Sequence, residues 1–289
     1  MEGIILKGYS GFYYVLADGE IWECALRGRH KMTGDDFLPG DRVRIRPART
    51  GRATIEEVLP RTSRLLRPPV ANVSRIVLVA ALSHPLPDPA LMDRILVLAE
   101  HTGIRPLMVL SKADLQEPGR FESMASDYRN TGYRMIRVSA RTGEGIGELE
   151  EELDGQVSVF AGQSGVGKSS IMNWLLEDQE LKTGTLGEKS RRGRHTTRHI
   201  ELFPWRGGFL ADTPGFSRLY LPAMEQNLLQ QCFPEFEPHL GQCRFASCLH
   251  HREPDCRVKE AVEAGDISRR RYENYLYLLR EVKGDKRYD

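Results

Sequence analysis

Residues 162–169 have the spacing of a phosphate-binding loop. They read Gly-Gln-Ser-Gly-Val-Gly-Lys-Ser, which fits the pattern Gly-x4-Gly-Lys-Ser. In such a loop the backbone N–H groups surround a phosphate, the lysine reaches the β- and γ-phosphates, and the serine hydroxyl is a ligand of Mg²⁺. An apolar run at 157–161 precedes the loop and apolar residues at helical spacing follow it, which favours this interpretation over a chance glycine-rich turn. We therefore expect a nucleoside di- or triphosphate to bind at Gly162, Gln163, Ser164, Gly165, Val166, Gly167, Lys168, Ser169 and Ser170.

A carboxylate that suits a magnesium site follows 43 positions after Ser169, at Asp212. It comes directly after the apolar stretch 208–211, so we expect it at the end of a strand. Asp-x-x-Gly is a common turn in isolation, but after a phosphate loop it holds Mg²⁺ and offers a glycine amide to the γ-phosphate. We predict Ser169 and Asp212 as magnesium ligands. The segment predicted to respond to the γ-phosphate, switch II, is Asp212, Thr213, Pro214 and Gly215.

Two short segments before the phosphate loop could read a base. Ser111-Lys112-Ala113-Asp114 follows the apolar residues 107–110, and Ser139-Ala140 follows 135–138. A carboxylate at Asp114 can accept hydrogen bonds from guanine N1–H and N2–H, a donor pair that adenine lacks, and a backbone N–H near Ala140 can meet guanine O6. Each segment alone is a weak signal. Their spacing relative to the phosphate loop is what predicts guanine recognition.

Four of the five cysteines lie in the C-terminal third, and three of them surround two histidines. The segment runs from Cys243 through Cys248, His250 and His251 to Cys256. Three thiolates and one imidazole make a closed tetrahedral zinc site without an open position for substrate. Either histidine can be the fourth ligand. Cys24 and Cys232 are expected to be ordinary thiols, with a redox switch as the alternative.

Composition is that of a water-soluble globular chain, with 289 residues, 28% charged residues, 40% apolar residues and a net charge of +1. The beginning of the chain lacks the basic-then-apolar order of a signal peptide, and no apolar run approaches the length of a membrane span, so we expect a cytoplasmic protein without membrane contact. Arginines cluster at 42–52, at 191–198 and at 269–271. Each cluster can be an ordinary solvated face, and together they favour a phosphate-binding surface.

The pattern of elements predicts a multidomain protein. Residues 1–67 contain short strands, an Asp18-Gly19 hairpin signal and a basic–apolar alternation at 42–46, which favours a small OB-like barrel, with an SH3-like barrel as the alternative. Residues 68–221 alternate strands and helices, as in an α/β P-loop domain with a largely parallel sheet. Residues 222–289 hold the cysteine cluster and a helix, and we expect a mostly α zinc-binding module there.

The order of these motifs resembles that of the circularly permuted GTPases, in particular the RsgA (YjeQ) family of small ribosomal subunit biogenesis GTPases. The base-reading segments precede the phosphate loop, and the resemblance covers the entire chain from barrel to zinc module. It implies GTP and GDP as ligands, Mg²⁺ with GTP, and one structural Zn²⁺ on Cys243, Cys248, His250 and Cys256, since the family spacing selects His250. One departure is Ser111, where GTPases most often carry Asn.

The resemblance also implies a mechanism and partners. Residues 184–198 have the composition and location of switch I, in which Thr196 or Thr197 completes the Mg²⁺ shell; we assign Thr197. The family places a catalytic histidine in this switch, and His195 matches it. Phe216 stands where Ras-like enzymes carry the glutamine that orients water, so we predict slow intrinsic hydrolysis. The implied partner of this monomer is the small (30S) ribosomal subunit with its rRNA, late in maturation, and the subunit stimulates hydrolysis of GTP to GDP.

Two other functions are compatible with the same residues. One is an RNA-binding protein whose P-loop site is switched by nucleotide but only weakly catalytic. The other is an ATP-using P-loop enzyme such as a kinase. Turnover with small subunits tests the first, and the nucleotide preference of Asp114→Asn tests the second.

Overall fold

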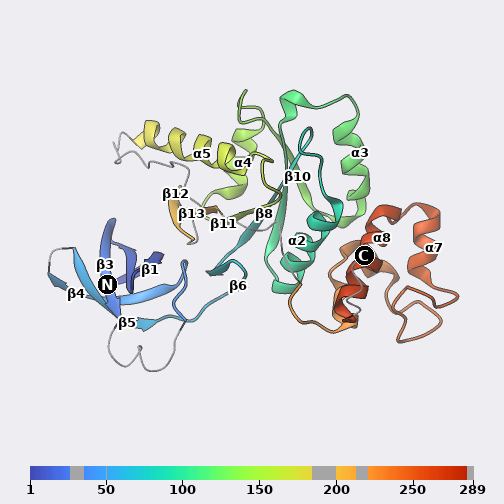
Figure 1. Ribbon diagram of the computed structural model, residues 1–289, viewed down its shortest axis with the longest axis horizontal. Coiled ribbons are helices and arrows are strands. Elements are labelled where there is room, and N and C mark those ends of the chain that lie inside the picture. The colour runs from blue at the N-terminus through green and yellow to red at the C-terminus, as the bar shows by residue number, and fades with distance from the viewer. Residues whose placement is uncertain (27–35, 50, 184–199, 213–220, 285–289) are drawn as a thin grey trace. The chain divides into compact units, whose positions relative to one another are not determined.

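The computed structural model describes residues 1–26, 36–49, 51–183, 200–212 and 221–284 (Figure 1). The chain forms two compact units. One comprises Met1–Ile76, Glu150–Phe160 and Lys168–Phe216, and the other comprises Val77–Leu149, Ala161–Gly167 and Ser217–Asp289. In the described ranges, no helix is both long enough and apolar enough to cross a membrane.

The N-terminal strands close into a five-stranded barrel, as predicted. Its strands are β1 (Glu2–Tyr9), β2 (Phe12–Ala17), β3 (Glu20–Leu26), β4 (Arg42–Arg49) and β5 (Arg52–Val58). The order β1-β2-β3-β5-β4, with β3 and β5 parallel, is a Greek-key OB-like arrangement rather than a simple meander. Asp18 and Gly19 make the predicted hairpin turn with φ of 50° and 80°.

Asp41 is a buried carboxylate in the barrel domain, among apolar side chains. Val43 and Ile45 point inward as the alternation in β4 predicts, and Asp41 is fully buried beside them. Its oxygens accept hydrogen bonds from Arg61 Nε at 2.6 Å, from Arg61 Nη2 at 2.8 Å and from the Leu38 N–H at 2.7 Å. These bonds compensate the desolvation of the charge and tie the loop before β4 to the segment after β5.

The central sheet has six strands in the order β10-β9-β8-β11-β13-β12. They are β8 (Arg75–Ala81), β9 (Arg105–Ser111), β10 (Arg134–Val138), β11 (Val157–Ala161), β12 (Leu202–Trp205) and β13 (Gly208–Asp212). The pairs β9/β10 and β11/β13 are parallel, whereas β12 runs antiparallel to β13 because only Arg206 and Gly207 connect them. The associated helices are α2 (Pro89–Thr102), α3 (Arg120–Asp127), α4 (Ile146–Leu153) and α5 (Lys168–Thr183).

Between barrel and sheet the chain forms a small hairpin, β6 (Arg64–Leu66) and β7 (Pro69–Ala71). It covers the Arg-Pro-Pro sequence at which we expected a domain boundary. Thus Pro68 and Pro69 belong to a tight reversal of the chain rather than to an extended linker.

The C-terminal segment is mostly helical, as expected. It contains α6 (Gln226–Gln231), the 3₁₀ helix η4 (Pro234–His239), α7 (Arg257–Ala264) and α8 (Arg269–Val282). Phe233, Phe236 and Tyr275 are fully buried and pack ring against ring at centroid distances of 5.0–5.3 Å. Helix α8 packs against α2, so this module shares an interface with the base-reading half of the P-loop domain.

We predict that Asp41→Asn destabilises the protein by about 2–3 kcal/mol, because Arg61 loses its charged partner inside the barrel. The matched control is Glu57→Gln, which removes one of the two acidic partners of the exposed Arg44 in the same barrel. Chemical denaturation monitored by tryptophan fluorescence measures both. Equal stabilities for the two variants would contradict the role assigned to Asp41.

Candidate nucleotide site and metal centre

The phosphate loop connects β11 to α5 through backbone that only glycine tolerates well. Gly162, Gly165 and Gly167 have φ of 137°, 78° and 101°. A Cβ on Gly162 would lie 2.2 Å from the carbonyl oxygen of Val79 in β8, a separation that requires the backbone to move. Helix α5 begins at Lys168, so the loop meets a helix N-terminus as phosphate binding requires.

The first base-reading segment is bonded directly to the phosphate loop. Lys112 Nζ donates to the carbonyl oxygens of Gly165 at 2.8 Å and of His84 at 2.5 Å. Ser111 is buried, and its Oγ lies 2.5 Å from Val166 O and 3.3 Å from Ala80 O. A hydroxyl has one proton, so the shorter contact identifies Val166 O as the acceptor. Ser111 therefore braces the phosphate loop although it replaces the usual Asn.

The second base-reading segment orients the carboxylate of Asp114. Ser139 Oγ donates to Asp114 Oδ1 at 2.6 Å, and Arg141 Nε lies 2.9 Å from Oδ2. The Ser139 hydrogen bond, with the nearby Arg141 charge, holds the pKa of Asp114 below its ordinary value. The side chain is thus an anionic acceptor at neutral pH, which is the form that binds the N1–H and N2–H of guanine. Ala113 lies in a 3₁₀ turn beside it, and Ala140 directly follows Ser139.

Two oxygen groups suited to magnesium lie together beyond the phosphate loop. Ser169 Oγ donates to Asp212 Oδ2 at 3.1 Å, which puts a hydroxyl and a carboxylate of the kind Mg²⁺ prefers within one coordination sphere. Burial lowers the pKa of the neighbouring Lys168, and the charge of Asp212 opposes that shift. A bound phosphate would act in the same direction as Asp212.

Several predicted residues lie outside the described ranges. They are His195, Thr196, Thr197, Thr213, Pro214 and Gly215. Of the predicted magnesium ligands, Ser169 and Asp212 are brought together, and the geometry of Thr197 is not part of the described structure.

The structure brings Cys243, Cys248, His250 and Cys256 together at the start of α7. Their ligand atoms all lie within 4.8 Å of one another. His250 Nδ1 is 3.6, 3.5 and 3.3 Å from the sulfurs of Cys243, Cys248 and Cys256, and the first and last of these sulfurs are 3.9 Å apart. Thiolates about 2.3 Å from a tetrahedral zinc stand roughly 3.8 Å apart, so these side chains fit Zn²⁺.

The alternative ligand, His251, is absent from this cluster. Its backbone N–H donates to Glu253 Oε2 at 2.8 Å. The other two cysteines are also separate. Cys24 and Cys232 are buried, and burial raises the pKa of each thiol to about 12, which makes them poor nucleophiles and argues against a redox role.

Glu253 and two tyrosines support the metal-binding loop, and our sequence analysis did not identify Glu253. Its carboxylate accepts the backbone N–H groups of Leu249 at 3.1 Å, His251 at 2.8 Å and Arg252 at 3.0 Å. Although burial opposes them, these bonds lower the pKa of Glu253 to about 2. From α8, Tyr272 and Tyr275 donate to the carbonyl oxygens of His250 and Leu249, each at 2.7 Å. The sequence signal that could have identified Glu253 is its position as an acidic residue between the predicted ligands His250 and Cys256.

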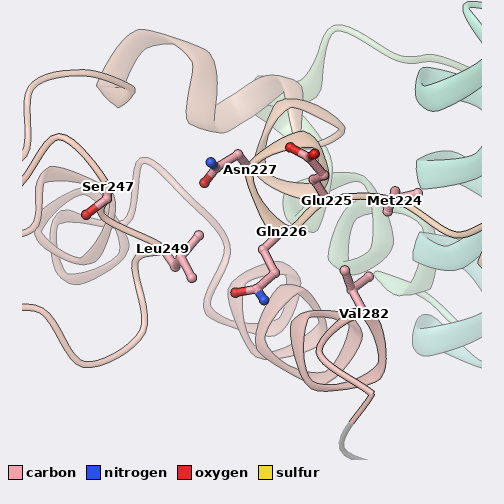
Figure 2. Close-up of a pocket in the computed structure, with 7 residues that line it drawn as sticks. All are labelled: Met224, Glu225, Gln226, Asn227, Ser247, Leu249 and Val282. Carbon is pink, nitrogen blue, oxygen red and sulfur yellow. The ribbon is translucent and has the colours of Figure 1, made fainter.

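A pocket of about 410 Å³ lies in the same module (Figure 2). The start of α6, the metal-binding loop and the end of α8 contribute its lining, which includes Gln226, Leu249 and Val282. Among the described residues that line it, Glu225 alone is charged, so the lining does not favour a nucleotide phosphate or RNA.

Several arginines of two predicted clusters already have acidic partners or are buried, so fewer of them can bind phosphate than the sequence indicates. On the barrel, Arg44 pairs with Glu57 at 2.5 Å and Arg46 with Glu56 at 3.1 Å, and Arg52 lies 3.4 Å from Glu23. The expectation that 269–271 forms one phosphate-binding cluster is wrong for Arg271, which is fully buried. Its neighbour Arg270 pairs with Asp127 at 2.5 Å. These partners are remote in sequence, so a count of arginines could not reveal them.

Family profiles and related sequences identify the same family. The sequence profile of the RsgA GTPase family matches residues 58–222, and that of the RsgA N-terminal domain matches residues 2–55. The chain is 49% identical over 283 residues to the small ribosomal subunit biogenesis GTPase RsgA of Moorella thermoacetica, covering 98% of this chain and 97% of the relative. It is 44% identical to that of Carboxydothermus hydrogenoformans, covering 99% of each.

Two crystal structures are similar over nearly the entire chain. YjeQ from Thermotoga maritima has a TM-score of 0.85 at 36% identity and 98% coverage of both chains. YloQ, described as a circularly permuted GTPase, has a TM-score of 0.82 at 36% identity, covering 100% of this chain and 96% of the other.

Replacing Ser111 with Ala should weaken binding of GDP roughly five- to tenfold, because Val166 O loses its donor and the phosphate loop loses a brace. Ser111→Asn should retain or improve affinity, since an amide supplies two protons. Fluorescence titration with a labelled GDP measures both. An unchanged dissociation constant for Ser111→Ala would show that the hydroxyl does not brace the loop.

Glu253→Gln should speed the loss of Zn²⁺ to a chelator at pH 7, because the backbone around His250 loses its charged acceptor. The folded pKa lies below the ordinary 4.5, so this stabilisation is complete above about pH 4.5 and is lost as the pH falls toward 2. The exposed Glu263→Gln on α7 is the control. Zinc release is followed with a colorimetric chelator, and identical release rates for the two variants would refute the role of Glu253.

Proposed function

Because the chain belongs to the RsgA GTPase family, we propose that it hydrolyses GTP on the small (30S) ribosomal subunit during late maturation of that subunit. Its relatives bear the name small ribosomal subunit biogenesis GTPase. The observation that carries the proposal is the pair of bonds from Lys112 to Gly165 and His84. They join a base-reading segment to a phosphate loop, which is what a guanine nucleotide spanning both requires.

In this proposal each described residue has a defined task. Asp114, held by Ser139, accepts the two guanine donors and discriminates against adenine. The backbone of 162–167 surrounds the phosphates, and Lys168 binds the β- and γ-phosphates. Ser169 and Asp212 hold Mg²⁺, which when bound neutralises charge that develops on the phosphates. The remaining assignments, Thr197 as magnesium ligand and His195 as the residue that positions water, stay proposals from the family pattern.

The switch segments connect hydrolysis to the rest of the molecule. The proposed switch II begins at Asp212, and the chain then runs into the zinc module. Loss of the γ-phosphate would release switch II and favour dissociation from the subunit. We assign residues 1–67 to an RNA-contacting barrel, 68–221 to the GTPase domain and 222–289 to the zinc module, in a monomer that works in the cytoplasm.

Contact with rRNA phosphates would use basic side chains. Among the described clusters, the barrel arginines face glutamates and Arg271 is buried. The basic sequence 189–198 lies outside the described residues and is a further candidate. Attachment through phosphates would be insensitive to sequence and would weaken with salt.

The proposal predicts that purified small subunits raise the rate of GTP hydrolysis by at least about an order of magnitude. Co-sedimentation should show tighter binding with a non-hydrolysable GTP analogue than with GDP. Turnover that is slow with and without subunits, together with RNA binding, would instead support an RNA-binding protein with a nucleotide switch.

Asp114→Asn should lower GTP affinity roughly a hundredfold and shift preference toward xanthosine triphosphate, since an amide donates to the O2 of xanthine. The control is Glu117→Gln, an exposed carboxylate three positions later. A chain that hydrolyses ATP, and whose preference does not respond to Asp114→Asn, would contradict guanine recognition.

A further inference from the structure

Helix α2 carries a fully buried carboxylate, Asp93, at a position where an apolar side chain would be expected. Its Oδ1 accepts hydrogen bonds from Tyr128 Oη at 3.0 Å and from Arg271 Nη1 at 2.6 Å. Its Oδ2 accepts a bond from Asn274 Nδ2 at 2.5 Å. Two of the three donors, Arg271 and Asn274, belong to α8 of the zinc module.

Arg271 is equally buried and uses its whole guanidinium group. Nε and Nη2 form a fork on Glu235 at 2.7 and 2.9 Å, while Nη1 reaches Asp93. Its Cζ lies 4.7 Å from the ring centroid of Phe233 and 5.1 Å from that of Tyr128. Each of the three guanidinium nitrogens has a carboxylate partner, which compensates the burial of the charge. Helices η4, α8 and α2 must therefore adopt one arrangement for this set of bonds to form.

The N-terminal end of α2, at Asp88, contacts the phosphate loop. Asp88 caps the helix by accepting the N–H groups of Ala90 and Leu91, and its own N–H donates to Gln163 Oε1 at 3.2 Å. Gln163 is the first variable residue of the phosphate loop. Gly165, two positions later, is held by Lys112, which also binds the carbonyl of His84. Residues 84–88 are thus joined to the phosphate loop at both ends, through Lys112 at His84 and through Gln163 at Asp88.

Asp88 and Asp93 are close along a rigid element. Five residues of α-helix span roughly 8 Å, less than two turns. Helix α2 therefore cannot shift at Asp93 without carrying Asp88, and Asp88 bonds to the phosphate loop. Three positive-φ glycines make that loop adaptable, so its conformation depends on such external supports.

We infer that Arg271 is a positioning residue for nucleotide binding, because it anchors α2, which in turn supports the phosphate loop through Asp88 and Gln163. The zinc module is then part of the framework of the nucleotide site. The inference rests on the proposed function in that it requires GDP or GTP to bind at residues 162–169. It assigns no contact between Arg271 and the nucleotide.

The first test measures GDP affinity of Arg271→Met, Arg271→Lys and Gln163→Ala, with Arg269→Met as the matched control. Arg269 lies on the same helix and is exposed. Arg271→Met and Gln163→Ala should each weaken GDP roughly five- to twentyfold, Arg271→Lys should do so less, and Arg269→Met should match the wild type. A folded Arg271→Met chain that retains its zinc and binds GDP with wild-type affinity would overturn the inference.

A double-mutant cycle guards against a variant that simply fails to fold. Asp93→Asn keeps the shape of the side chain, and Gln163→Ala is far from it along the chain of contacts. If Asp93 acts through Asp88 and Gln163, the double variant will bind GDP more tightly than the product of the two single-variant losses predicts. The difference should be at least about threefold. Fully additive losses would refute the path.

The coupling must also work in reverse, because binding free energies are reciprocal. GDP should slow chelator-driven release of Zn²⁺ from the wild type at least about threefold, less in Arg271→Lys, and hardly at all in Arg271→Met. A merely structural role for Arg271 would change the basal release rate without removing the GDP effect, and that result would oppose the inference. A wild type that binds no guanine nucleotide would contradict the proposed function instead.

Discussion

The ammonium group of Lys112 is the constraint on which the nucleotide site depends. It bonds the carbonyl oxygens of His84 and Gly165, which belong to segments that precede and follow it in the chain. These loops leave the carboxyl ends of parallel strands, which meet at one edge of a sheet whatever their order in sequence. A circular permutation can therefore preserve the site. What changes is which elements are covalently next to it, here a barrel before the domain and a zinc module after it.

The zinc module combines two ways of stabilising a small unit. Its aromatic core is packed beside a cluster of three cysteines and one histidine, which would add a second centre of stability when Zn²⁺ is bound. Tyr272 and Tyr275 join the two, since their rings pack in the core and their hydroxyls hold the metal-binding loop. The buried Arg271 then fixes the module on α2. Because breaking such an ion pair costs more than forming it gains, its main effect is to select one arrangement.

The charge on the surface of the barrel is reduced by ion pairs between neighbouring strands. Strand β4 presents alternating arginines outward, and glutamates of β1 and β5 lie beside them. Exposed pairs of this kind contribute little to stability, but they reduce the positive potential available to an RNA phosphate. The exposed arginines of the barrel are therefore weaker candidates for phosphate contacts than their number in the sequence indicates.

The sequence by itself determined the features that depend on short spacing. These are the glycine-rich loop at 162–169, the Asp18-Gly19 hairpin, the clustering of the three cysteines and the strand–helix alternation, because their geometry is local and their residue types are restrictive. Only the tertiary structure decided which charged side chains face solvent and which are paired or buried. It buried Arg271 between two carboxylates, paired the barrel arginines, and placed Glu253 beneath the metal-binding loop. Each of these outcomes depends on how the backbone brings partner groups together, and burial determines whether a charge faces water or another charge.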